Sequence, residues 1–333
     1  MLILFSALIA LPTCKREPDQ LKRIEILPNS LLAANSRPTL LATNLDNPES
    51  PFLYQDNVVF SQSGKGEISM VSQKGGPIKP LITGFAFDNF NNYKISVQGI
   101  VIDPVTKQWI VCAAEDAGYL LAFTPTSFPT TVATGRKIVL EGADADNPYD
   151  VVLPGGRIII ASGGTAKAYG GPYPINESGI LKPLFTVSTG ITGLAIDPKS
   201  GDVFGAVFGT TKPDGSVIRF QPTLEQPSIK TVASGFTNLV DVAFTPDGQL
   251  LALEFGSFPE EGKPIQSNGT VSIVSTDGTG KVTPLVRGLA NPTGLFVSDR
   301  ALFITEFGAS LNNQRGNLIS IPLTKGSGNT GGI

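Results

Sequence analysis

The sequence predicts an all-β fold, namely a six-bladed β-propeller with four antiparallel strands in each blade. One pattern of turns and short apolar runs recurs six times along the 333 residues. A repeat of roughly 40–50 residues that holds four short strands is typical of propellers. The chain also contains 37 Gly and 26 Pro residues, which favours many turns and few helices.

The repeat is clearest in two segments. Residues 291–308 read NPTGLFVSDRALFITEFG, and residues 238–256 read NLVDVAFTPDGQLLALEFG. Weaker copies cover residues 190–209, 147–163, 96–118 and 47–64. When the copies are aligned, one column contains Ser50, Gly99, Asp150, Gly193, Asp241 and Gly294, at spacings of 49, 51, 43, 48 and 53 residues. This regular spacing predicts one blade for each copy.

Turn residues divide each copy into strands. The innermost strands are expected at residues 51–54, 99–103, 150–153, 193–197, 241–245 and 294–298. A tight turn such as Pro246-Asp247-Gly248 leads to the second strand. The third strands are expected to follow Gly66, Gly118, Gly179, Gly215, Gly269 and Gly316, and the outer strands include residues 230–233 and 283–287.

The two ends of the repeat region predict how the ring closes. The last copy ends after its third strand, at residues 316–322, and an extra strand at Thr39–Thr43 precedes the first copy. We expect this extra strand to complete the last blade, because such closure removes a free sheet edge. An open β-sandwich or two β domains is the alternative. The expected organisation is an export segment at 1–14, a tether at 15–37, the propeller at 38–323 and a flexible tail at 324–333.

The N-terminus predicts export. Residues 1–11 read MLILFSALIAL, an apolar stretch shorter than the ~20 residues of a membrane span but suited to a signal-peptide core. Residues Leu11 to Cys14 resemble a bacterial lipobox, in which Cys14 would carry the lipid. Simple secretion and an unmodified Cys14 are the alternatives. We therefore expect an extracytoplasmic protein of the cell envelope, attached to the membrane through a lipid anchor only, or else a secreted one.

The residue composition excludes several kinds of site. The chain has no histidine, which excludes Ser-His-Asp triads, His-ligated zinc and a histidine general base. A metal site would need oxygen ligands, which suit Ca²⁺ or Mg²⁺. The net charge is -3 and Lys and Arg are not clustered, so nucleic acid is not an expected partner. Cys112 lies in an apolar strand at 109–112 and is expected to be a buried core residue.

The repeat resembles known propeller families. Segments of the form NPTG followed by ALFITEFG resemble the NHL and SMP-30/gluconolactonase-like six-bladed propellers, and the blade at residues 232–256 looks most like the ScyD/ScyE family. The SMP-30-like resemblance implies lactone hydrolysis with a divalent cation held by Glu, Asn and Asp. Residues 47–54 read NPESPFLY and depart from the Glu-Gly-Pro-type segment of that family. Quinoprotein sugar dehydrogenases share the six-bladed shape but use a histidine base, which this chain lacks.

Candidate site residues are those expected around the central channel. An Asn precedes the innermost strand in four copies, at Asn47, Asn147, Asn238 and Asn291. These residues either form a partial ring of amides at the channel mouth or serve the turns, since Asn tolerates the left-handed conformation.

Acidic residues form the second group of candidates. Asp150 and Asp241 fall in the aligned column, Glu254 and Glu306 end second strands, and Glu115 has a similar place. Acids in a narrow channel share protons, bind a cation or pair with donors. One hypothesis is therefore a Ca²⁺ site formed by Asp241, Glu254, Glu306 and Asn291. The alternative is that these side chains accept hydrogen bonds from neighbouring backbone amides.

Three functions stay open. The leading hypothesis is an anchored binding or scaffold protein for a protein, glycan or small-molecule ligand, because no catalytic motif is present. A metal-dependent hydrolase of the lactonase type and a purely structural surface protein are the alternatives. Loops at 85–93, 163–178 and 257–268 contain aromatic or amide residues that either bind a ligand or cap the core. We expect a monomer.

Overall fold

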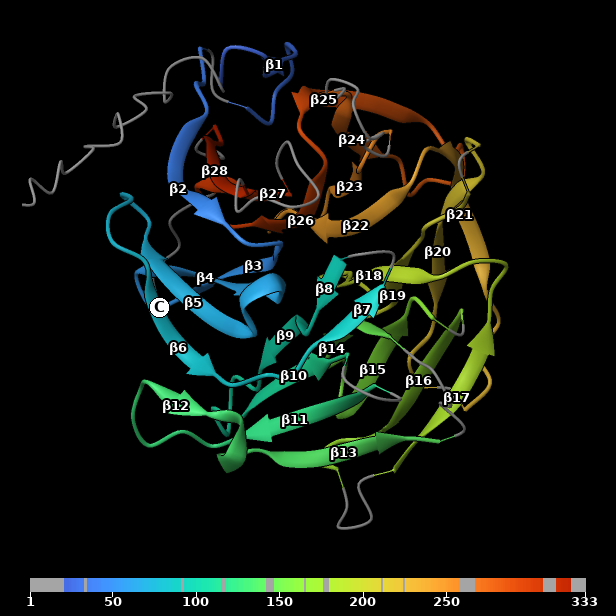
Figure 1. The fold of residues 1–333 in the computed structure, drawn as a ribbon. Coiled ribbons are helices and arrows are strands. Elements are labelled where there is room, and N and C mark those ends of the chain that lie inside the picture. The colour runs from blue at the N-terminus through green and yellow to red at the C-terminus, as the bar shows by residue number, and fades with distance from the viewer. Residues whose placement is uncertain are drawn as a thin grey trace, which may run out of the picture.

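The computed structural model is a ring of β-sheets (Figure 1). It describes residues 21–324 except 33–34, 91–92, 115–117, 142–146, 165, 176–179, 211, 224, 258–266 and 308–315. Two short 3₁₀ turns, η1 (Ser63–Lys65) and η2 (Val132–Thr134), interrupt the strands. The ring of sheets confirms the predicted all-β propeller fold. No helix within these described ranges is long and apolar enough to cross a membrane.

The ring is built from antiparallel four-stranded units that follow one another along the chain. Their strands, from the innermost outward, are β3 (Pro48–Tyr54), β4 (Asn57–Gln62), β5 (Glu67–Ser72) and β6 (Lys79–Thr83); β9 (Val97–Ile102), β10 (Trp109–Ala113), β11 (Tyr119–Phe123) and β13 (Arg136–Leu140); β14 (Pro148–Val152), β15 (Arg157–Ser162), β16 (Lys167–Pro172) and β17 (Ile180–Thr186); β18 (Ile191–Ile196), β19 (Val203–Val207), β20 (Gly215–Phe220) and β21 (Lys230–Phe236); β22 (Leu239–Phe244), β23 (Leu250–Glu254), β24 (Gly269–Val274) and β25 (Val282–Leu289); and β26 (Pro292–Val297), β27 (Ala301–Glu306), β28 (Gly316–Pro322) and β2 (Thr39–Leu45).

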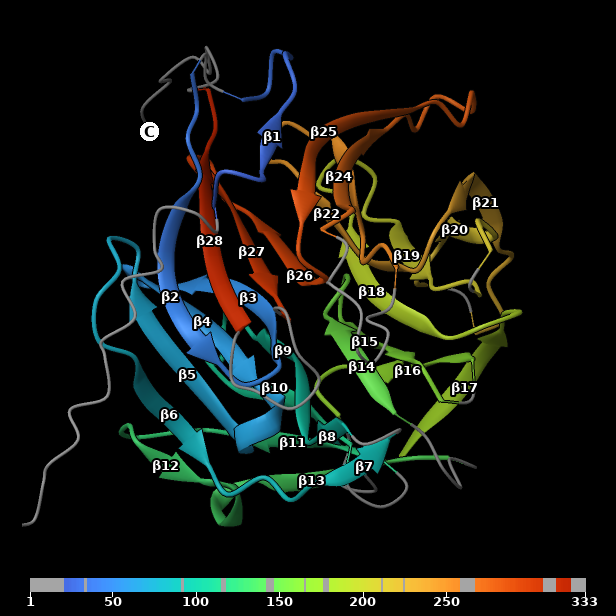
Figure 2. The ribbon, with the colours of Figure 1, turned by 45° about the horizontal axis from the view of Figure 1, so that its top comes forward.

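The innermost strands contact one another in a closed cycle. The contacts run from β3 to β9, β14, β18, β22 and β26, and from β26 back to β3. The expected closing strand is β2, which pairs antiparallel with β28 (Figure 2). The unit β9–β13 and the unit β14–β17 join into one eight-stranded sheet, because their outer strands β13 and β17 pair in parallel.

One strand prediction and one loop prediction need correction. The third strand of the unit after Asn147 was expected to follow Gly179, but β16 is the third strand and β17, which starts at Ile180, is the outer one. Gly170 and Gly171 lie inside β16, so the glycine rule placed this strand too late. Tyr169, expected in a loop, is buried in β16.

Apolar side chains fill the space between neighbouring sheets. Between the β3–β6 and β9–β13 units, Trp109 packs edge-on against Phe52, Tyr54 and Phe128 at ring distances of 5.9, 5.2 and 5.2 Å. Cys112 is free and fully buried in β10, as predicted. Hydrophobic burial therefore holds neighbouring sheets together, and the β13–β17 pairing adds a shared hydrogen-bond ladder between one pair of units.

The segment expected to be a tether is part of the domain from Leu21 on. β1 (Glu25–Ile26) pairs with the outer strand β25 (Figures 1 and 2). Ile24 and Leu32 are buried in the core beneath it. Arg23 Nη2 lies 2.6 Å from both carboxylate oxygens of Glu306, whose side chain is fully buried. Proline and polar residues suggested a flexible linker, but these anchoring side chains fix the segment to the ring.

Two further short elements extend the ring. β12 (Thr130–Thr131) pairs in parallel with β6, and β7 (Asp88–Phe90) pairs with β8 (Tyr93–Ile95) as a hairpin that leads directly into β9. The hairpin starts in the connection at 85–93, which the sequence predicted as a candidate loop, and extends to Ile95.

Candidate functional site

Every innermost strand contains a β-bulge near its start. In β14, β18, β22 and β26 the extra residues are Tyr149, Thr192, Val240 and Thr293. In β9, Gln98 and Gly99 oppose one residue of β10, and β3 has a similar irregularity after Glu49. Bulges redirect side chains and are frequent beside functional sites. They also explain why these strands begin two or three residues before the sequence-based limits.

Two aspartates of the aligned column tie neighbouring innermost strands together. Asp150 on β14 accepts hydrogen bonds from Val151 N at 2.8 Å and from Leu194 N on β18 at 2.7 Å. Asp241 on β22 repeats the arrangement with Val242 N and with Leu295 N on β26, both at 2.7 Å. The alternative reading, in which the column acids bond to backbone amides, therefore describes both residues.

The residue before the column supplies a second kind of tie. Thr192 on β18 donates a hydrogen bond to the carbonyl of Leu239 on the next innermost strand, at 2.9 Å. Thr293 on β26 donates in the same way to the carbonyl of Pro48 on β3. Each threonine precedes a column glycine, and the next strand comes close at that point. A Cβ on Gly193 would lie 2.7 Å from the Cα of Asp241.

These ties alternate around the ring and stop at β9. The pattern is Thr-Gly on one strand and an aspartate on the next, but β9 has Gln98 before Gly99 and β3 has Ser50 in the aspartate position. No side chain of the described residues makes the equivalent bond to β9 from Ser50, or from Gln98 to β14. The strand β9 therefore lacks this kind of tie, although Ser96, directly before it, is joined to Ser63 of the preceding unit by hydrogen bonds of 2.6 and 2.8 Å.

Three polar side chains meet at this break. The Gln98 amide is fully buried and lies near enough to the Glu49 carboxyl and the Tyr149 hydroxyl to lower the pKa of both. These contacts lower the two pKa values as hydrogen bonds would, but they lack ordinary hydrogen-bond geometry, and neither amide atom of Gln98 has another partner among the described residues. A buried amide without partners costs free energy, on the order of 1–3 kcal/mol. We call Glu49, Gln98 and Tyr149 the break cluster.

Burial dominates the protonation of the break cluster. It raises the pKa of Glu49 to about 8, against the smaller opposing effect of Gln98. Burial, and then the charge of Glu49, raise the pKa of Tyr149 above its usual range. Tyr149 keeps partial exposure to solvent, whereas Glu49 is only 5% exposed. At neutral pH the cluster is a set of mostly uncharged donors and acceptors beside the ring axis.

The column aspartates are also shifted. Burial raises the pKa of Asp150 to about 7, against the hydrogen bonds from Leu194 N and Val151 N. Burial and then the charge of Asp150 raise the pKa of Asp241 further. Burial is likewise the main cause of the raised pKa of the Cys112 thiol, and the Asp150 charge adds to it. The charge of Asp150 thus disfavours ionisation of Asp241.

The expected Ca²⁺ ligands do not come together. Glu306 accepts hydrogen bonds from Arg23, from Ala290 N at 2.7 Å and from Asn317 Nδ2 at 3.3 Å. Glu254 accepts one from Thr237 N at 2.9 Å, and burial raises its pKa. Across the ranges that the structure describes, no three His, Cys, Asp or Glu residues form a group that could hold a metal ion. Glu254 and Glu306 instead fix backbone at the ends of their strands.

The asparagines before the innermost strands serve the turns. Asn47, Asn238 and Asn291 have φ of 48°, 53° and 49°, which Asn tolerates better than most residues. The side chain of Asn238 donates to Gly256 O at 2.7 Å, and that of Asn291 donates to Ser257 O at 2.8 Å. Asn147 takes part through its carbonyl, which accepts from Gly163 N at 2.9 Å. Glu115 and Cys14 lie outside the described residues.

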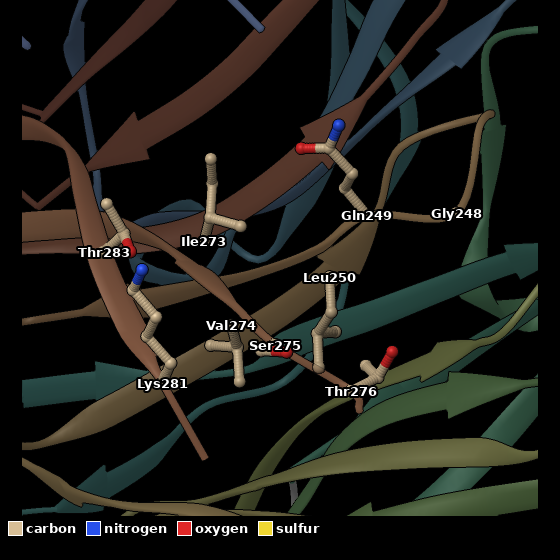
Figure 3. A pocket seen from close by; sticks show the side chains of 9 residues that line it. All are labelled: Gly248, Gln249, Leu250, Ile273, Val274, Ser275, Thr276, Lys281 and Thr283. Carbon is tan, nitrogen blue, oxygen red and sulfur yellow. The ribbon is translucent and has the colours of Figure 1, made fainter. Parts of the chain in front are cut away.

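A separate depression lies beside the turn that precedes β23 and the turn that joins β24 to β25. It has a volume of about 320 Å³ and is lined by residues of β23, β24 and β25, such as Ile273, and by residues of the adjoining turns, such as Gln249 and Lys281 (Figure 3). It does not include any bulge residue, so we do not place the candidate site there.

Comparisons with known proteins give the fold a counterpart. No family model and no curated protein matches the sequence. A gluconolactonase from Xanthomonas campestris has a similar structure, with a TM-score of 0.66 at 13% identity over 90% of this chain and 95% of that one. The chain has a gluconolactonase-like propeller fold. A luciferin-regenerating enzyme (TM-score 0.61, 11% identity, 86% and 95% covered) and an aldose sugar dehydrogenase from Streptomyces coelicolor (0.57, 12%, 87% and 99%) are also similar.

The gluconolactonase-like fold leaves the chemistry of this chain to its own residues, because these identities establish the fold alone. The break cluster was missed in the sequence because it lies one position before the aligned column. The aligned column does contain one signal, because Ser50 stands in the place of an aspartate. That this replacement removes a tie to β9 can be seen only once the bulges are known. The ScyD/ScyE likeness stays a prediction.

Proposed function

We propose that this chain is a six-bladed propeller that binds a small polar molecule at the break cluster of Glu49, Gln98 and Tyr149. Six equivalent backbone bonds support the blade count: the residue after each second strand donates to the residue three before the aligned column. The donors are Ser63, Ala114, Gly163, Phe208, Phe255 and Phe307.

The observation that carries the binding proposal is the unpartnered Gln98 amide. Its burial is complete and both of its polar atoms lack a hydrogen bond among the described residues. The hydroxyl groups of Thr192 and Thr293, at the equivalent positions, donate hydrogen bonds to backbone carbonyls of the neighbouring strands. Gln98 does not join neighbouring strands as these threonines do, and its amide has no other partner in the described protein. A bound ligand would supply the missing hydrogen bonds.

A thermal-shift screen of small amines, polyols, carboxylates and lactones tests the proposal. A compound at 100 times its Kd stabilises the folded chain by about 2.7 kcal/mol, which raises Tm by roughly 5 °C. We expect such a compound to lose its effect on the Gln98→Leu variant and to keep it on Gln249→Leu, a matched change at a half-buried residue outside the cluster. Shifts that survive Gln98→Leu, or a screen without shifts, would contradict binding at this cluster.

Hydrolysis of a lactone is the second candidate function. It is favoured by the gluconolactonase-like fold and by two carboxyls whose pKa values of about 7 and 8 suit general acid–base work near neutral pH. Glucono-δ-lactone turnover that is lost in Glu49→Gln would support it. Turnover equal to the uncatalysed rate would remove it.

The cellular context completes the proposal. We propose export to the cell envelope with a lipid on Cys14, and a monomeric propeller whose loops contact a protein or glycan partner. Mass spectrometry of the membrane fraction tests the anchor, because a diacylglyceryl thioether on Cys14 adds a defined mass that Cys14→Ser loses. A full-length soluble chain would contradict it.

A further inference from the structure

The depression beside β23, β24 and β25 lies apart from the break cluster and has polar groups of its own. The register of the sheet places Ile273 opposite Thr283, and a further backbone bond runs from Ser275 N to Lys281 O at 2.9 Å. Side chains alternate between the two faces of a sheet, so these four side chains share one face. Figure 3 shows Ile273, Thr283 and Lys281 on the same side of the sheet.

The neighbouring blade covers only part of this face. Leu251, which pairs with Ile273, is fully buried in a cluster with Val297 of the next blade. Ile273 is half-buried, whereas Thr283 and Lys281 are exposed. The depression therefore has an apolar floor at Ile273 and polar side chains at its rim.

Two polar groups of the depression have no partner within the described protein. Neither the Lys281 ammonium nor the Thr283 hydroxyl makes a hydrogen bond or an ion pair to another residue of the described ranges. Ser275 adds a second hydroxyl on the same face. Among the described residues that line the depression, none is acidic. An ammonium group beside hydroxyl groups suits a ligand that has a negative charge and hydroxyl groups of its own.

Size and charge narrow the class of ligand. A volume of about 320 Å³ is that of roughly ten water molecules, so a single inorganic anion would fill little of it. Asp247 and Asp277 lie in the adjoining turns, and Lys199 Nζ lies 2.8 Å from the position that a Cβ would take on Gly248. Because two acids balance the charges of Lys199 and Lys281, the surroundings favour a ligand with one negative charge over a dianion. A sugar with one carboxylate meets both conditions.

We infer that this depression binds a hexuronate, whose carboxylate pairs with the Lys281 ammonium and whose hydroxyl groups form hydrogen bonds with Thr283 and Ser275. The C–H groups of the sugar ring pack on Ile273. The residues of this site are separate from the break cluster, so the inference goes beyond the proposed function and does not depend on it. Because the ion pair is open to water, it adds only a few-fold to the affinity.

A methyl NMR titration of the full-length protein tests the site, with the Ile273 signal assigned through Ile273→Val. The probes are sodium glucuronate, glucose and sodium phosphate at equal ionic strength. We expect glucuronate to shift the Ile273 methyl signal saturably in the millimolar range. Glucose lacks the charge and phosphate lacks the sugar ring, so each should bind roughly 5-fold more weakly.

Two variants locate the binding. Lys281→Gln should weaken glucuronate binding roughly 5-fold and leave glucose binding unchanged, whereas Thr283→Val keeps the charge and should weaken the binding of both sugars. Both residues are exposed, so these variants are expected to fold, and their Tm values check this. Lys79→Gln removes an equal charge from β6 of another blade and should leave the titration unchanged.

Four results would overturn the hexuronate inference. Two of them are glucose or phosphate that binds as tightly as glucuronate. The others are the absence of a saturable shift of the Ile273 signal and glucuronate binding that Lys281→Gln leaves unchanged. None of these results bears on the break cluster, because its own test is the loss of ligand binding in Gln98→Leu.

Discussion

Asp150 and Leu194 join two neighbouring innermost strands through a 2.7 Å hydrogen bond from backbone N–H to carboxylate. Asp241 and Leu295 repeat this bond two strands further on. The third aspartate position holds Ser50, and there the ring carries the break cluster instead. The ties thus explain both what joins the sheets at the axis and where a ligand would find free polar groups.

Removing an aspartate tie should weaken the ring. Asp241→Ala leaves Leu295 N without its acceptor, and an unsatisfied buried N–H costs on the order of 2 kcal/mol. Urea unfolding of the variant measures this loss. Asp56→Ala, in the exposed turn between β3 and β4, serves as the control and should change the free energy of unfolding by less than about 0.5 kcal/mol. Equal stability of the two variants would show that the tie contributes nothing.

Close approach at the column makes one glycine hard to replace. A Cβ on Gly193 would lie 2.5 Å from Asp241 Oδ1 and 2.7 Å from its Cα, so backbone must move. Gly193→Ala should destabilise the chain by roughly 1–3 kcal/mol. Gly205→Ala, whose Cβ would come no nearer than 3.2 Å to a side-chain carbon, should cost less. Thermal unfolding of both variants checks the order, and the reverse order would contradict the packing described.

Much of the fold could be predicted from the sequence, because turns and apolar runs are local signals. The column and the closing strand Thr39–Thr43 came from such signals. The misplaced third strand shows their limit, since Gly170 and Gly171 look like turn residues but lie inside β16.

The site was harder to predict, because it depends on contacts between strands about 50 residues apart. The acids Asp241, Glu254 and Glu306 looked like one group in the aligned repeats, yet each accepts hydrogen bonds from different backbone. Glu49 and Gln98 were not predicted as site residues, because only the bulges bring their side chains into the break cluster. The residue pattern predicted polar groups at the axis but not their partners.

The Arg23–Glu306 ion pair should matter more than its surface counterpart. Glu306 is fully buried, so Arg23→Ala removes its counter-ion and leaves only the hydrogen bonds from Ala290 N and Asn317 Nδ2, which should cost roughly 3 kcal/mol. Arg219→Ala breaks a pair with Asp202 that is partly exposed, and should cost about 1 kcal/mol or less. Denaturant unfolding at pH 7 compares them. A similar cost for both would mean that the segment around β1 is not fixed by this pair.

Glu49 should make stability depend on pH. Its pKa is raised from 4.5 to about 8 in the folded chain, so the folded state binds the proton more tightly than the unfolded state. This contribution to stability is full below pH 4.5 and is lost as the pH rises through 8. The loss between pH 4.5 and pH 7 is at most roughly 3 kcal/mol. Unfolding of Glu49→Gln should therefore depend less on pH between 4.5 and 8 than unfolding of the wild type. Identical pH profiles would contradict the burial of a protonated Glu49.

The most direct test of the account is the free energy of unfolding of Gln98→Leu without ligand. If Gln98 is kept for binding, leucine removes an unpartnered buried amide and should raise stability by about 1–2 kcal/mol. A fall in stability of that size would show that the Gln98 amide stabilises the ring itself, and the break cluster would no longer mark a ligand site.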